Sequence, residues 1–189
     1  MAGAVALLLA VAAAQAQQPA AGAKAAPKGN TVQAAAPAQA PGGGQATLLA
    51  SFGDWGAYAA QRDKSKLCYA MTQPKNREPK NLNRDPAYLF VSSQPADGVR
   101  NEVSLVMGFP AKDGVDASAA VGQTNFALVT KVANAWVKNP AEEGRVIDAL
   151  KKGDKLVVRS ESKRGSKLTD EYSLKGFNEA LARVQRECP

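Results

Sequence analysis

Five short runs rich in β-branched and aromatic residues follow one another along the chain, each bounded by Pro, Gly, Asn or Asp. Runs of this length and composition are typical of β-strands and their turns. They are Leu67–Gln73, Ala87–Ser93, Glu102–Phe109, Asn125–Thr130 and Lys155–Ser160. The turn sequences Ala96-Asp97-Gly98 and Lys163-Arg164-Gly165-Ser166 predict hairpins. Short connections favour antiparallel pairing, so we predict a mainly β fold, an antiparallel β-sandwich or partial barrel.

Two later segments change to helical spacing, at about residues 139–152 and 174–187. In the first, Asn139 can cap the helix, Pro140 suits its first turn and Gly153 can close it. Its apolar face is Val146, Ile147 and Leu150. In the second, apolar residues recur at spacings of three and four: Leu174, Phe177, Leu181, Val184 and Cys188. Each stripe predicts a helix packed on the sheet.

The chain contains two cysteines, Cys68 and Cys188, and no Cys-x-x-Cys motif. In an oxidising compartment two cysteines allow one intramolecular bridge. Cys188 continues the apolar stripe of the second helix, so its sulfur should face the sheet, where the strand that carries Cys68 lies. We therefore predict a structural disulfide between them.

The first residues have the character of an export signal. Ala4–Ala14 is uncharged and apolar but too short to span a bilayer as a helix, and Ala14-Gln15-Ala16 fits a signal peptidase site. No Lys or Arg precedes the apolar run. Residues 17–46 contain several Pro and Gly and no aromatic residue, which predicts a disordered linker. We expect a signal peptide over residues 1–16, a single globular domain over 47–189, and a periplasmic or secreted protein.

The charge of the chain is basic. Residues 1–46 hold two lysines and no acid, so the 24 basic and 17 acidic residues leave a net charge of +5 on residues 47–189. A basic surface favours anionic partners, and export makes nucleic acid the least expected of these. We expect an anionic component of the envelope or of a host surface, with membrane association at most peripheral. A solvated basic surface without a partner is the alternative.

The segment Pro74–Pro86 is the candidate partner surface. It contains three prolines and four basic residues and has no aliphatic period. Long loops of this kind are often functional, and their side chains are expected to project into solvent. The four basic residues are Lys75, Arg77, Lys80 and Arg84. The alternative is a solvated excursion in which Glu78 and Asp85 offset half of the charge.

The absence of histidine excludes most familiar catalytic groups. Without it there is no Ser-His or Cys-His nucleophile and no His-ligated zinc. No dinucleotide or P-loop motif is present, so we expect no cofactor and no metal. Ser160 and Lys163 match the S-x-x-K pattern of Ser-Lys nucleophiles, but the companion motifs are missing. We expect a non-enzymatic protein, and the alternative is a periplasmic hydrolase that uses carboxylates or this Ser/Lys pair.

An ordered set of motifs carries a family resemblance. Phe52-Gly53-Asp54-Trp55, a cysteine-containing strand, and Tyr172–Phe177 followed by Ala180-Leu181 together resemble the invasion-associated locus B family of small exported bacterial proteins. The resemblance spans nearly all of residues 47–189. It implies an exported protein with no defined enzymatic activity, in a family named for members associated with entry into host red cells. Members often carry a cysteine shortly after Gly-Asp-Trp, where this chain has Ala59 and Ala60.

The Phe-Gly-Asp-Trp motif also has a structural interpretation. Phe52 and Trp55 are large apolar residues suited to anchoring the sheet. Gly53 and Gly56 suit a bend or bulge, and Asp54 could cap backbone N–H groups within it. We expect the motif to begin the fold rather than to form a site.

Overall fold

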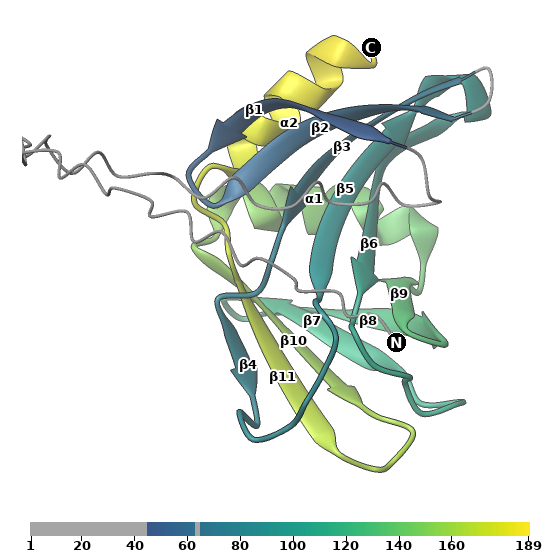
Figure 1. Cartoon of the computed structure of the whole chain (residues 1–189), viewed down its shortest axis with the longest axis vertical. Helices are drawn as coiled ribbons and strands as arrows, with labels where there is room; N and C mark the ends of the chain where they lie inside the picture. The colour runs from purple at the N-terminus through teal and green to yellow at the C-terminus, as the bar shows by residue number, and fades with distance from the viewer. Residues whose placement is uncertain (1–44, 63–64) are drawn as a thin grey trace, which may run out of the picture. The chain divides into compact units, whose positions relative to one another are not determined.

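The computed structural model describes residues 45–62 and 65–189 (Figure 1). The expected signal peptide, and the expected linker except for its last two residues, lie outside the described residues. The strands are β1 (Ala46–Phe52), β2 (Trp55–Arg62), β3 (Ser65–Thr72), β4 (Asn76–Glu78), β5 (Tyr88–Gln94), β6 (Val99–Val106), β7 (Ala117–Val121), β8 (Thr124–Lys131), β9 (Asn134–Val137), β10 (Lys155–Glu161) and β11 (Lys167–Ser173). The helices are α1 (Glu143–Lys152) and α2 (Phe177–Glu187), and two short 3₁₀ turns are η1 (Pro95–Asp97) and η2 (Pro140–Glu142).

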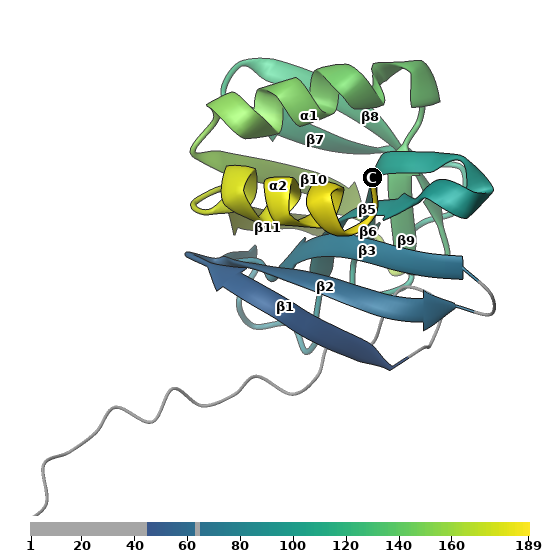
Figure 2. The same ribbon diagram turned by 90° about the horizontal axis from the view of Figure 1, so that it is seen from above.

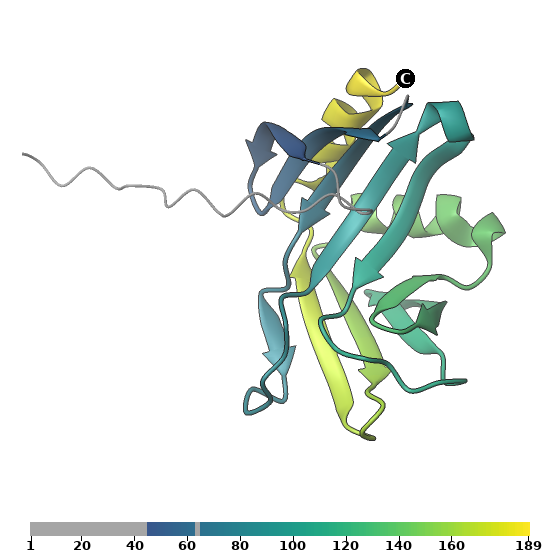
Figure 3. The ribbon, with the colours of Figure 1, turned by 45° about the vertical axis from the view of Figure 1, so that its right-hand side comes forward.

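The strands form one 11-stranded sheet in the order β1-β2-β3-β5-β6-β9-β8-β7-β10-β11-β4. Every neighbouring pair is antiparallel. The sheet curls but does not close, because β1 and β4 remain its two edges (Figures 1 and 3). This confirms the predicted mainly antiparallel β fold of the sandwich or partial-barrel type.

Both predicted hairpins are present. η1 and Gly98 connect β5 to β6, and the turn at residues 163–166 connects β10 to β11. Gly98 has φ +71°, and its N–H donates to the carbonyl of Pro95 at 3.0 Å. A positive φ costs glycine little, which explains why Gly follows Asp97 here.

The two helices pack side by side (Figure 2), α2 against β1, β2, β3 and β5 and α1 against β6. Asn139 caps the first segment as predicted, its Oδ1 accepting from the N–H of Ala141 at 3.2 Å. The segment begins with η2 before α1 proper. α2 begins at Phe177, three residues later than expected, because Gly176 has φ +91° and cannot continue a right-handed helix. Leu174 is still buried beside it.

The predicted disulfide joins Cys68 of β3 to Cys188 at the end of α2, with a Cα–Cα distance of 6.0 Å. Both cysteines are buried in the main core between the sheet and the helices. The apolar stripe therefore carries Cys188 inward, as its spacing predicted. The bridge fixes α2 to the strand on which it packs.

The Phe-Gly-Asp-Trp motif is the hairpin turn between β1 and β2, and it packs on the chain just before α2. The Trp55 indole N–H donates to the carbonyl of Ser173 at 2.9 Å, and its ring lies 4.8 Å from that of Phe177. A Cβ on Gly176 would lie 1.8 Å from the carbonyl oxygen of Phe52, so only glycine fits there. Two of the motifs that carry the family resemblance therefore contact each other in the fold.

Asp54 differs from its expected role as a local cap. Its carboxylate pairs with Lys75 at 2.5 Å, while its backbone N–H donates to the carbonyl of Lys175 at 3.0 Å. The hydrogen bond from Lys75, followed by one from Ser173, lowers the pKa of Asp54 below its usual value. The side chain thus links the β1–β2 turn to the segment that leads into β4.

Candidate functional site

The four basic residues of Pro74–Pro86 do not share one environment. Lys75 and Lys80 are exposed, with 58% and 78% of their side chains accessible, and they pair with Asp54 and Glu78. Arg77 and Arg84 retain only 21% and 6%. The expectation that all four project into solvent is therefore wrong for the two arginines. The reason is that part of this segment forms β4, which pairs with β11 and directs Arg77 into the fold.

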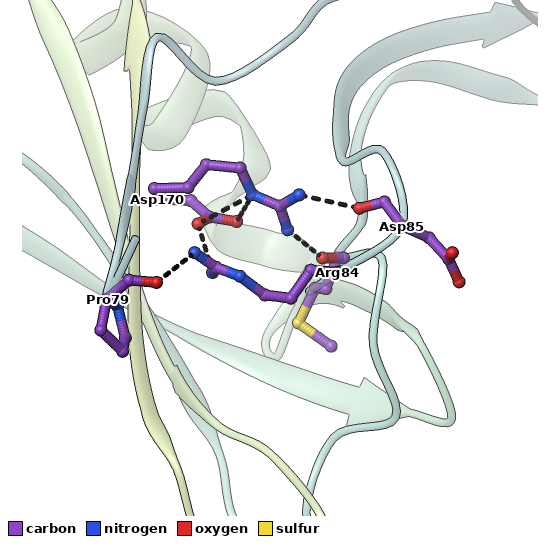
Figure 4. Close-up of polar contacts among 6 residues, drawn as sticks. Pro79, Arg84, Asp85 and Asp170 are labelled. Carbon is purple, nitrogen blue, oxygen red and sulfur yellow. Dashed lines mark hydrogen bonds and ion pairs between the residues drawn. The ribbon is translucent and has the colours of Figure 1, made fainter. Parts of the chain in front are cut away.

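Asp170 of β11 holds both arginines. Arg77 lies directly opposite Asp170 in the β4–β11 register, and its Nε lies 3.2 and 3.3 Å from the two carboxylate oxygens. Arg84 reaches the same carboxylate from the following loop, with its Nη1 at 3.0 Å from Oδ1 (Figure 4). Asp170 keeps 7% of its side chain accessible. The buried guanidinium of Arg84 and the partly buried one of Arg77 thus share one buried carboxylate, which leaves a positive excess.

Three backbone carbonyls accept further hydrogen bonds from the two arginines. Arg77 donates to the carbonyls of Asp85 at 2.7 Å and Met107 at 2.8 Å, and Arg84 donates to that of Pro79 at 3.2 Å. Such charge-assisted bonds are stronger than neutral ones. These bonds hold the segment between β4 and β5 against the rest of the domain. The two arginines therefore fix the position of the loop.

Gly108 brings a second segment against this loop. It has φ +72°, and its carbonyl accepts from the N–H of Asp85 at 3.0 Å. A Cβ at this position would lie 2.1 Å from the carbonyl oxygen of Asp85. The close approach therefore requires glycine, and it forms one wall of a cavity.

The cavity has a volume of about 360 Å³, a size typical of sites for small ligands. It lies between three segments: the loop after β4, the chain after β6, and the β10–β11 hairpin. Its lining residues are Leu82, Asn83, Arg84, Asp85, Gly108, Phe109, Pro110, Ser162, Lys163, Arg164, Ser166 and Leu168. We refer to it as the basic cavity.

One lysine and one arginine of the β10–β11 hairpin give the cavity its positive charge. Lys163 and Arg164 are both exposed, and within residues 45–62 and 65–189 neither has an ion-pair partner. Nearby Lys112, by contrast, pairs with Glu161 at 2.6 Å. Asp85 is the one acidic residue among the lining residues, and its carboxylate points away from Arg84 and Asp170 (Figure 4). The site therefore suits an anion.

The hydrolase alternative finds little support in this arrangement. Lys163 lines the cavity together with Ser162 and Ser166, whereas Ser160 is not a lining residue. Asp170 faces two arginines, and both of its carboxylate oxygens accept hydrogen bonds from them. Burial, reinforced by the charge of Asp170, raises the pKa of the Tyr172 phenol beyond its usual range, so Tyr172 remains neutral. In the described part of the chain, no group of three or more His, Cys, Asp or Glu side chains could hold a metal ion.

Sequence analysis missed Asp170 and the hairpin at residues 162–166 as parts of one site. β4 has three residues and lies 93 positions from Asp170, so no periodic pattern could reveal their pairing. The available signal was the Lys-Arg-Gly-Ser turn itself, which the sequence predicts as a hairpin and whose Lys163 it singles out as half of a Ser-Lys pair rather than as a cation that binds an anion.

These features define a disulfide-linked antiparallel β domain with two helices on the sheet and a basic cavity at the opposite end. The model of the family described as invasion associated locus B (IalB) protein matches residues 55–185, and the chain belongs to this family. The comparisons with curated proteins and with solved structures found no match. No helix among the described residues is long and apolar enough to cross a membrane.

Proposed function

We propose that this protein is an exported, non-enzymatic binding or accessory module that acts in the periplasm or after secretion. Membership in the invasion associated locus B family supports an exported, invasion-associated role and supplies no reaction. The apolar run before Ala14-Gln15-Ala16 also supports export.

The partner that we propose is an anionic component of the bacterial envelope or of a host surface, not nucleic acid. One observation carries this proposal: Lys163 and Arg164, which have no ion-pair partner among the described residues, line a cavity next to a cluster of two arginines and one buried carboxylate. Charges beside a protein interior interact more strongly than charges in bulk water, so the buried excess adds to the attraction for an anion. Contact with a membrane would be peripheral.

The roles of the basic residues differ in this proposal. Lys163 and Arg164 contact the partner, whereas Lys80 is exposed but paired with Glu78. Arg77 and Arg84 position the loop through their hydrogen bonds to Asp170, and their positive charge adds to the attraction for an anion. Lys75 is engaged with Asp54 and serves the fold.

The test replaces Lys163 and Arg164 together with Gln. Binding is measured by flotation with phosphatidylcholine vesicles that contain or lack phosphatidylglycerol, and by retention on heparin. A Lys or Arg near an anionic surface contributes about 1 kcal/mol, so the double variant should bind roughly thirtyfold more weakly. Binding should also fall as salt is added.

The matched control replaces Lys151 and Lys152 with Gln. Lys151 and Lys152 are likewise two adjacent, exposed basic residues, but they lie at the end of α1. An equal loss in the control would show that net charge alone drives binding and that the cavity is not the site. Absence of binding to both anionic probes would contradict the proposed function.

A further inference from the structure

The basic cavity has an apolar side that a simple inorganic anion would not use. Leu82 is one of the few large apolar residues that stay exposed, at 37%, and it lines the cavity with Phe109, Pro110 and Leu168. Exposing such a side chain to water is unfavourable, at about 25 cal/mol per Å² of apolar area. A ligand that covers Leu82 would recover that free energy.

The polar side of the cavity offers donors. The Ser162 hydroxyl oxygen accepts the N–H of Ser166 at 3.1 Å, which leaves its hydrogen available to donate. Lys163 and Arg164 follow Ser162 directly in the chain, and Asn83, beside Leu82 in the loop after β4, adds an amide. Lys163, Arg164 and Ser162 thus come from the β10–β11 hairpin, whereas Leu82 and Phe109 come from the other two segments that line the cavity.

From this division we infer that the cavity takes a small amphipathic anion. Its acidic head, a phosphate ester or carboxylate, is held by Lys163, Arg164 and Ser162, and a short aliphatic or aromatic body lies against Leu82 and Phe109. The volume of about 360 Å³ exceeds the needs of an acidic head alone. This inference rests on the proposed function only in assuming that the cavity holds an anion.

Calorimetric titration of the full chain with ethyl, butyl, hexyl and octyl phosphate tests the inference. Affinity should rise with chain length by about fourfold for each methylene that is buried, until the cavity is filled. Octyltrimethylammonium, which has the same body and the opposite charge, should not bind. Competition of hexyl phosphate with phosphatidylglycerol vesicles distinguishes the two sources: release from vesicles assigns the cavity to a lipid phosphate and its first carbons, and no release assigns it to a free amphipathic anion.

Two variants separate the head from the body. Leu82→Asn should weaken hexyl phosphate and leave ethyl phosphate unchanged, whereas Lys163→Gln with Arg164→Gln should weaken both. Leu48→Asn is the matched control, because Leu48 is also exposed, at 51%, but lies on β1 at the other edge of the sheet. Affinity that does not change with chain length, or equal binding of the ammonium probe, would overturn the inference. If affinity does not change with chain length but ethyl phosphate or vesicles still bind, the proposed function stands and only the amphipathic ligand is refuted. Loss of binding to every anionic probe would refute both the proposed function and this inference.

Discussion

The two ends of this domain are held together by different interactions. At the disulfide end, α2 packs on β1, β2 and β3 through apolar side chains and the Cys68–Cys188 bridge. At the arginine end, β4 and the loop after it are held on β11 by Arg77, Arg84 and Asp170 (Figure 4). The first set of contacts is neutral, and the second leaves a positive excess.

The difference separates stability from binding. Apolar contacts and a disulfide stabilise the disulfide end without leaving an unbalanced charge in its core. Buried ion pairs contribute less net stability because desolvation opposes their attraction. The ion pairs at the arginine end instead fix the loop after β4 and leave a net positive charge, and the basic cavity lies at this end.

Removing the disulfide should have the largest effect. The bridge closes a loop of 120 residues, for which the chain-entropy estimate is about 4–5 kcal/mol. We expect Cys68→Ala with Cys188→Ala to lose a free energy of unfolding close to that amount in urea denaturation. The loss should be insensitive to salt, because no charge is removed. A loss near zero would show that apolar packing alone holds α2 on the sheet.

Replacing Asp170 with Asn should cost about 3 kcal/mol, the low end of the range for breaking a buried ion pair. The low end applies because Arg77 keeps 21% of its side chain accessible and both arginines retain carbonyl partners. Urea denaturation measures the loss. The control is Asp116→Asn, which removes an exposed pair with Lys138 and should cost no more than about 1 kcal/mol. Equal losses in the two variants would refute the claim that charge holds this end.

The smallest effect concerns Asp54, which links the two ends through Lys75. Asp54→Asn should cost less than about 1 kcal/mol at pH 7, because its partner Lys75 is exposed and solvent screens the pair. Lys75 and Ser173 lower the pKa of Asp54, so its contribution is present above the unfolded value of about 3.9 and is lost as pH falls through the lowered folded value. Denaturation of both proteins at pH 7 and below pH 4 should show the difference shrinking. A difference that grows on acidification would contradict this assignment.

Local patterns were enough to predict much of the disulfide end. The stripe from Leu174 to Cys188 has helical spacing, and with Cys68 on a recognisable strand it indicated both the helix and the bridge. Gly53 and Gly176 lie within motifs that resembled the family. Each of these signals is contained within a few turns of chain.

The arginine end could not be predicted in the same way. Arg77 and Arg84 are typical of a solvated loop by composition, and their burial depends on Asp170, a residue of a distant strand. Likewise Leu82 and Lys163 come together only after β4, β10 and β11 have paired. The sequence identified the basic segment as a candidate surface. Long-range strand pairing then determines which of its basic side chains stay exposed to solvent.

The connectivity of the disulfide has a consequence for protease resistance. Cys68 and Cys188 enclose β4 to β11 and both helices within one covalent loop, and that loop includes the exposed residues 78–83 and the hairpin at 163–165. A single protease cut at either exposed site would break the chain without separating its parts. Both fragments would stay joined through the bridge, and with them Lys163, Arg164 and the loop that faces them, until a reductant released the pieces.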